Sequence, residues 1–85
     1  MNHQLSKRFV PHSEVMEIAA GMQNLFLVGP LFSQSRIPQI AFHAAEHLED
    51  RGISPKRSLC LLVAKQALAM WLGTIQAVQT KQANS

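Results

Sequence analysis

The segment from Ser54 to Lys81 limits the fold of this 85-residue chain more than any other feature. Its apolar residues repeat at helical spacing and cover an arc of roughly 220°, whereas a surface helix usually has an apolar stripe about 100° wide. Two sets of side chains face in opposite directions, with a flank between them. They are Leu59, Val63, Met70 and Ala77 on one side, Leu61, Leu68, Leu72 and Ile75 on the other, and Cys60, Ala64, Trp71 and Val78 on the flank.

An arc this wide has to be covered on both sides, and so short a chain has little other protein to do it. A chain of this size buries only about 60–65% of its unfolded surface, and small proteins often compensate with disulfides, a metal or oligomerisation. Cys60 is the only cysteine, so no disulfide forms within the chain. We therefore expect a homodimer, or another partner, on this helix. The predicted interface residues are Leu61, Leu68, Trp71, Leu72 and Ile75.

Local signals predict an all-α fold of three helices. The predicted helices are 14–28, 38–50 and 55–79. Ser13 is a suitable N-cap for the first, and Pro30 cannot continue it. Pro38 suits the first turn of the second helix, and Gly52 suits its C-terminal stop. Ser54 followed by Pro55 is a strong start signal for the third, with serine as N-cap and proline at the first helical position.

The chain is expected to form a single domain, 13–80, between a flexible basic tail, 1–12, and a frayed tail, 81–85. The first residues lack the apolar centre of a signal peptide. Lys65 and Gln66 interrupt the most apolar run, and a membrane span needs about 20 largely uncharged residues. A lone cysteine is typical of a reducing compartment. We therefore expect a cytoplasmic protein without a membrane partner.

The basic residues suggest two kinds of partner. The formal charge is +3, and the predicted contact patch is Arg51, Lys56 and Arg57. Lys56 and Arg57 stand at the positive end of the third helix, where they gain nothing from its dipole. Their position suggests an acidic protein partner. The alternative is DNA, with Lys7, Arg8 and the contact patch on phosphates.

The DNA alternative has some support in the turn between the second and third helices. Gly52 followed by Ile53 resembles the turn of a helix-turn-helix motif, and Ile53 and Leu61 fit its apolar positions. His47, Arg51 and Ser58 stand where apolar residues are usual. The would-be recognition helix also carries few side chains that read base edges.

The sequence His43-Ala44-Ala45-Glu46-His47 has the form H-x-x-E-H, which resembles the inverted zinc-protease motif. Residues four apart on a helix face the same way, so His43 and His47 are suited to one metal ion. A catalytic zinc needs a third protein ligand, and the candidates His3, His12 and Asp50 stand at no distinctive spacing. We therefore predict no enzyme, no cofactor and no metal site, with metal binding by the two histidines as the open alternative.

These observations favour a binding function. We expect a small helical protein–protein interaction module, a regulator or inhibitor of the anti-activator kind, which offers an apolar helix face to a larger protein. The alternative is a small DNA-binding transcriptional regulator with a degenerate helix-turn-helix. Cys60 has no base predicted beside it, so we interpret it as a core or interface residue.

Overall fold

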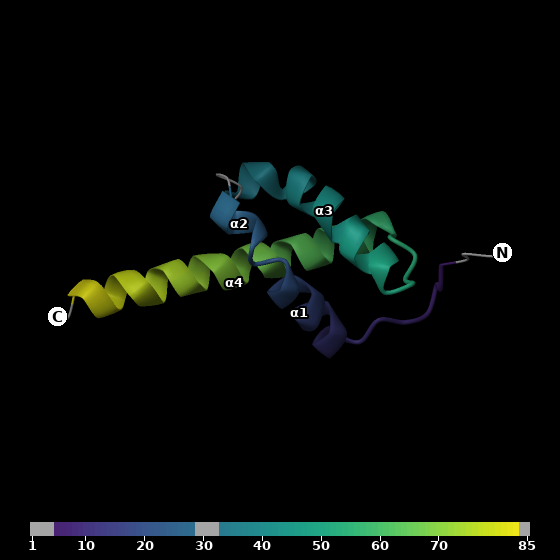
Figure 1. The fold of residues 1–85 in the computed structure, drawn as a ribbon, viewed down its shortest axis with the longest axis horizontal. Coiled ribbons are helices and arrows are strands. Elements are labelled where there is room, and N and C mark those ends of the chain that lie inside the picture. The colour runs from purple at the N-terminus through teal and green to yellow at the C-terminus, as the bar shows by residue number, and fades with distance from the viewer. Residues whose placement is uncertain (1–4, 29–32, 84–85) are drawn as a thin grey trace.

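Three long helices make up most of the fold, which confirms the all-α prediction. The computed structural model describes residues 5–28 and 33–83 and is 75% helical, with no strand in these ranges (Figure 1). The long helices are α1 (His12–Gly21), α3 (Ile37–Asp50) and α4 (Arg57–Ala83). A short helix, α2 (Leu25–Val28), and a 3₁₀ turn, Gln34–Arg36, lie between α1 and α3.

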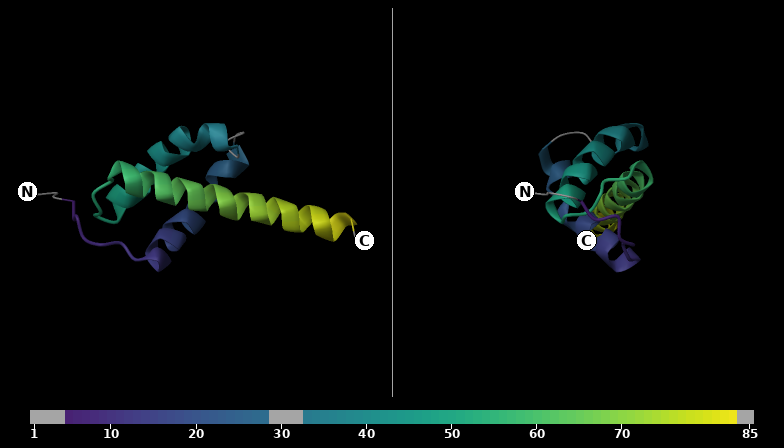
Figure 2. Two further views of the ribbon diagram at one scale, coloured as in Figure 1. Left: turned by 180° about the vertical axis from the view of Figure 1, so that it is seen from behind. Right: turned by 90° about the vertical axis from the view of Figure 1, so that its right-hand side faces the viewer.

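Helix α4 is the axis of the molecule. Helices α1 and α3 pack against it from different sides and touch each other much less (Figure 2). They cover its first half, and its second half projects past them, so that the molecule measures 56 × 23 × 20 Å (Figures 1 and 2). The first half of α4 is therefore part of the core, and the second half extends beyond the other helices.

The core forms where α1 and α3 meet the first half of α4. Cys60 and Ala64, from the flank of the apolar arc, lie at the centre of this packing. Residues from both sides of the arc are buried beside them. The buried residues of α4 are Cys60, Val63, Ala64, Ala67 and Leu68; those of the other elements are Val15, Ile18, Ala19, Met22, Phe26, Ile40, Ala44, Leu48 and Ile53. Much of the arc that we expected a partner to cover is thus buried within one chain.

The predicted first helix, 14–28, is wrong as a single element. The backbone bends after Gly21 through short-range hydrogen bonds, among them Met22 N–H to the Ala19 carbonyl at 3.2 Å. Glycine is a weak helix former, and the Gln23 amide then fixes the bend by donating to the carbonyls of Ala19 (2.9 Å) and Ala67 (3.2 Å). Helical spacing continues across the bend, which is why the sequence pattern does not reveal it.

The end of α3 is where the sequence predicts it. Gly52 has a φ of +73°, the left-handed conformation that favours glycine. Its N–H donates to the Glu49 carbonyl, and the Ile53 N–H donates to the Leu48 carbonyl, both at 2.9 Å. These two bonds form a Schellman motif, and the buried side chains of Leu48 and Ile53 accompany it.

The predicted start of α4 at Pro55 is wrong by two residues. The Lys56 carbonyl accepts the hydrogen bond from Cys60 N–H at 2.9 Å, which places the N-cap at Lys56 and not at Ser54. The Ser54 N–H instead donates to the Ser6 carbonyl at 2.7 Å, in a parallel bridge between Ser6 and Ile53. Helix α4 also runs on to Ala83, past the predicted end at 79 and into the predicted C-terminal tail.

Candidate interaction surface

The five predicted interface residues fall into two groups. Leu68 is only 3% exposed and belongs to the core, and Leu61 and Trp71 are partly buried on the covered half of α4. Leu72 is 41% exposed, and Ile75 is partly buried beyond it. The structure therefore removes Leu68 from the predicted interface and leaves Leu72 as its most exposed member.

Trp71 marks the end of the covered half. Its indole ring stacks on Phe26 of α2, with ring centroids 5.6 Å apart and planes at 17°. The indole N–H is buried, and no described residue accepts a hydrogen bond from it. The bend between α1 and α2 is what brings Phe26 to this position. Trp71 is thus the last large side chain that the body of the protein covers.

We call residues 72–83 the α4 extension. Leu68, Trp71, Ile75 and Val78 follow one another at spacings of three and four, so the stripe that faces the core continues along the extension. Val78 is 51% exposed and Leu72 41% exposed; they lie on the two margins of this stripe, with the partly buried Ile75 between them. The extension therefore carries an apolar stripe, and in Figure 2 none of the other described helices lies alongside its outer end.

An open groove of about 410 Å³ lies beside the start of the extension. It runs between α4 and the beginning of α3. Its lining is Gln34, Ile37, Lys65, Leu68, Ala69 and Leu72. The exposed side chain of Leu72 thus belongs both to the groove and to the margin of the stripe.

The sequence of α4 between Lys65 and Lys81 contains no charged residue. Among the described residues, one stretch, Arg57–Val78, has the length and apolar composition of a membrane span. Core helices of soluble proteins meet the same criteria, and α1 and α3 cover the first half of this one (Figure 1).

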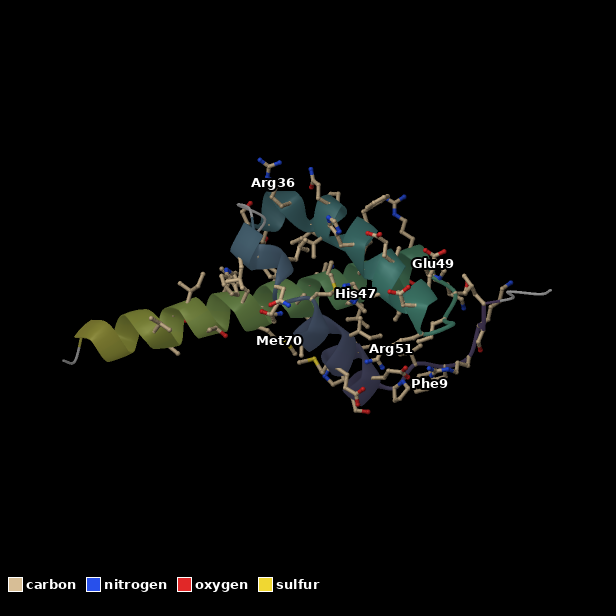
Figure 3. All side chains as sticks on the ribbon, viewed as in Figure 1. Phe9, Arg36, His47, Glu49, Arg51 and Met70 are labelled. Atoms are coloured by element: carbon tan, nitrogen blue, oxygen red, sulfur yellow. The ribbon has the colours of Figure 1, made fainter. Side chains whose placement is uncertain are left out.

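Within the predicted basic patch, Arg51 has ion partners among the described residues. Arg51 lies between α1 and the end of α3 (Figure 3), where its Nη1 is 3.3 Å from both Glu14 Oε2 and Glu17 Oε1. Lys56 and Arg57 are exposed at the start of α4. Arg51 therefore acts as a link between helices, and the other two cations remain on the surface.

The Glu14 carboxylate accepts hydrogen bonds from two parts of the chain. Arg8, in the segment before α1, donates two hydrogen bonds of 2.8 Å to its carboxylate, and Arg51 adds a third. The hydrogen bond from Arg8, with the Arg51 contact, lowers the pKa of Glu14, and the same bond raises the pKa of Arg8. The predicted tail, 1–12, is thus attached to the body at Ser6 and Arg8 in its described part.

The histidine motif belongs to no group of three metal ligands in the described residues. His43 Nδ1 lies 3.4 Å from Glu46 Oε1, and its ring meets Phe42 edge-on. Within residues 5–28 and 33–83, no three side chains of His, Cys, Asp or Glu are placed to hold one metal ion. Cys60 is buried, and burial raises the pKa of its thiol, so this group is a poor nucleophile.

Two features of the surface lie outside the predicted site. In the sequence analysis, Val78 lies on the flank of the arc and is not among the interface residues. Its spacing of three from Ile75, which is itself four after Trp71, is the signal that would have included it. Leu27, 70% exposed on α2, has no sequence signal, because it lies on a segment predicted to continue the first helix. Comparison with known protein families, with curated proteins and with solved structures gave no match to this chain.

Proposed function

We propose that this chain is a helical protein–protein interaction module that binds through the α4 extension and forms a homodimer by it. One observation carries the proposal. Leu72 and Val78 are 41% and 51% exposed on either side of Ile75, along a helix that projects past the rest of the fold (Figure 1). A row of exposed large apolar side chains on a soluble domain usually marks a binding surface.

Covering a fully exposed leucine- or valine-sized side chain contributes roughly 1.5–3 kcal/mol. Leu72 and Val78 are about half exposed, so covering each contributes about half of that amount. An amphipathic helix that lies in an apolar groove is a recurrent mode of protein recognition. A small protein of this kind regulates or inhibits a larger one by occupying the groove that another helix would fill.

We propose no catalytic role, and we expect the protein to act in the cytoplasm, where Cys60 stays reduced. The DNA-binding alternative gains no support. Arg51 is held by two carboxylates, and Lys65 is the only charged residue between Ser58 and Val78. A recognition helix that reads base edges carries polar and basic side chains along its outer face.

Photocrosslinking from the extension tests the proposal. A photoreactive phenylalanine analogue, benzoylphenylalanine, is placed at Val78 in the expressed protein. The matched control carries the same group at Phe42, which is 69% exposed on the outer face of α3. We expect discrete crosslinked products from position 78 and none from position 42. The product mass then distinguishes a second copy from another protein.

Two results would contradict the proposal. The absence of any product from position 78 would mean that nothing covers the extension. Equal yields from positions 78 and 42 would mean that the products come from random collision and not from a defined surface.

A further inference from the structure

We propose that the other end of α4 carries a second interaction surface, a basic groove that binds an acidic peptide segment of a partner protein. The groove has a volume of about 380 Å³ and lies between the segment before α1 and the start of α4. One wall is the segment 6–10, and the other includes Ser54, Lys56 and Leu59. The groove shares no residue with the α4 extension, so it is independent of the dimer proposed above.

The wall before α1 is attached to the body on both sides of Lys7. The Ser6 backbone forms two hydrogen bonds with the turn after α3, of 2.8 and 2.7 Å. Arg8 donates two hydrogen bonds of 2.8 Å to the Glu14 carboxylate. Lys7 therefore stands between two attached residues, and the groove is formed before a partner binds, which lowers the entropic cost of binding.

The cations of the groove have no acidic neighbour in its lining. Lys7 belongs to one wall and Lys56 to the other, and both are exposed. Neither forms an ion pair with a residue that the structure describes. Arg57 is exposed next to Lys56. Because opposite charges attract and like charges repel, a ligand between these walls is favoured when it is negative.

The start of α4 adds to the positive charge of the groove. The Lys56 carbonyl accepts a helical hydrogen bond from Cys60 N–H, and the first N–H groups of a helix have no acceptor within it. Acidic residues commonly stabilise this positive end of a helix, yet the first turn of α4 contains none. A carboxylate of a partner can therefore take the place that an aspartate or glutamate occupies in other helices.

An aromatic side chain belongs to the same groove. Phe9 lies on the segment before α1 (Figure 3) and is 84% exposed, the largest value among the large apolar residues that the structure describes. Leu59, on the opposite wall, is partly buried. Exposed aromatic residues often anchor a binding partner. An acidic peptide with an apolar residue among its acids matches both properties of the groove.

The shape of the groove favours a peptide over a nucleic acid or a membrane. Lys7 and Lys56 stand on two walls, so the ligand has to be narrow enough to enter between them. A protein that binds duplex DNA commonly contacts about six or more phosphates. Arg8 is already held by Glu14, so Lys7, Lys56 and Arg57 are too few for such a surface.

Fluorescence anisotropy with the full-length protein tests the proposal. The probe is a short fluorescein-labelled peptide with a central leucine flanked by glutamates, and the reference peptide has glutamines in their place. We expect the glutamate peptide to bind with an affinity that falls as salt is added, because salt screens exposed charges. We expect no binding of the glutamine peptide. Equal binding of the two peptides would overturn the proposal.

Lys56→Glu and Lys65→Glu form a matched pair of charge reversals. Both lysines are exposed, but only Lys56 lines the basic groove. Lys65 lies about 14 Å further along the helix, beyond the Debye length of about 8 Å at physiological salt. We expect Lys56→Glu to weaken binding of the glutamate peptide about tenfold, since it replaces an attraction by a repulsion. We expect Lys65→Glu to change it by less than about twofold.

The stability of Lys56→Glu excludes unfolding as the cause of weaker binding. A glutamate suits the positive end of a helix dipole, so we expect this variant to be at least as stable as the wild type in urea. Similar losses of binding from Lys56→Glu and Lys65→Glu would overturn the proposal, because the peptide would then respond to net charge and not to the groove.

Phe9→Ala and Phe42→Ala separate the groove from exposed aromatic surface in general. Phe42 is 69% exposed on α3 and does not line the groove. We expect Phe9→Ala to weaken binding of the glutamate peptide severalfold and Phe42→Ala to leave it unchanged, since an aromatic anchor acts where the ligand lies. Equal effects of the two substitutions would contradict the assignment of the peptide to this groove.

Two competitors decide the class of partner. Oligothymidylate and phosphatidylglycerol vesicles are added to the bound glutamate peptide at physiological salt, and we expect neither to displace it as well as unlabelled peptide does. Stronger displacement by oligothymidylate would assign the groove to a nucleic acid, and stronger displacement by vesicles would assign it to a membrane surface. Failure of the glutamate peptide to bind folded, dimeric protein would refute the groove and leave the proposed function standing.

Discussion

Two glycines of this chain, Gly52 and Gly73, have different backbone conformations. Gly52 closes the turn after α3 at a φ of +73°, where a side chain is strained whatever the space around it. Gly73 lies inside α4 in a helical conformation, and an added Cβ would meet no atom within 4 Å. Alanine is therefore unfavourable at the first position and favourable at the second.

The two alanine substitutions are expected to change stability in opposite directions. Gly52→Ala should lower the free energy of unfolding by about 1–2 kcal/mol, the cost of a left-handed residue with a Cβ. Gly73→Ala should raise it by about 0.5–1 kcal/mol, because glycine loses more entropy in a helix. Urea unfolding followed by circular dichroism measures both. Changes of the same sign would contradict the two backbone conformations.

Trp71 shows where residue-level patterns stop being informative. Its helical position placed it correctly between the two sides of the apolar arc. Its partner, Phe26, lies on a segment that seemed to be the end of a straight helix, so the stacking that ends the covered half of α4 was not predictable. The residue pattern identified which side chains are apolar but not how far along α4 they are covered.

At the level of elements, prediction succeeded where the signal is local. The stop after α3 depends on one glycine and its immediate neighbours, and the structure has it where the sequence indicates. The start of α4 fails because the Ser54 N–H bonds to Ser6, far away in the sequence. The bend after Gly21 depends on Gln23 reaching the Ala67 carbonyl. Neither long-range contact leaves a pattern in the local sequence.

The ion pairs of Glu14 should make the attachment of α1 to Arg8 and Arg51 depend on pH. Its pKa is lowered in the folded chain, chiefly by the hydrogen bond from Arg8. A carboxyl group with a lowered folded pKa stabilises the fold above its ordinary pKa of 4.5, and this contribution is lost as the pH falls through the lower folded value. The contribution is therefore complete at neutral pH, and it changes with pH only in acid solution.

Glu14→Gln tests this linkage. The variant should be less stable than the wild-type chain at pH 7, and the difference should shrink steadily below pH 4.5 as the wild-type carboxyl group takes up its proton. Urea midpoints at pH 7, 5, 4 and 3 would measure it. Glu49→Gln is the control, because Glu49 is exposed on α3 and forms no ion pair within the described residues. A difference that grows in acid would contradict the direction of the shift.

The whole molecule shows why the predicted interface extended too far toward the N-terminal end of α4. The sequence argument held that a chain this short could not cover both sides of a wide apolar arc. Helices α1 and α3 do cover both along the first half, with Leu68 in the core. How much of α4 they reach depends on the bend after Gly21 and on helix length. Of the five predicted interface residues, Leu72 is the one that stays exposed.

The mass of the protein in solution tests the central proposal most directly. Light scattering over a wide range of concentration is compared between the wild-type chain and a Leu72→Glu, Val78→Glu double variant, whose changes lie at exposed positions. We predict twice the 9.4 kDa chain mass for the wild type, persisting on dilution, and a folded single chain for the variant. A folded wild-type monomer at the highest concentration would contradict the proposal that a second copy covers the α4 extension.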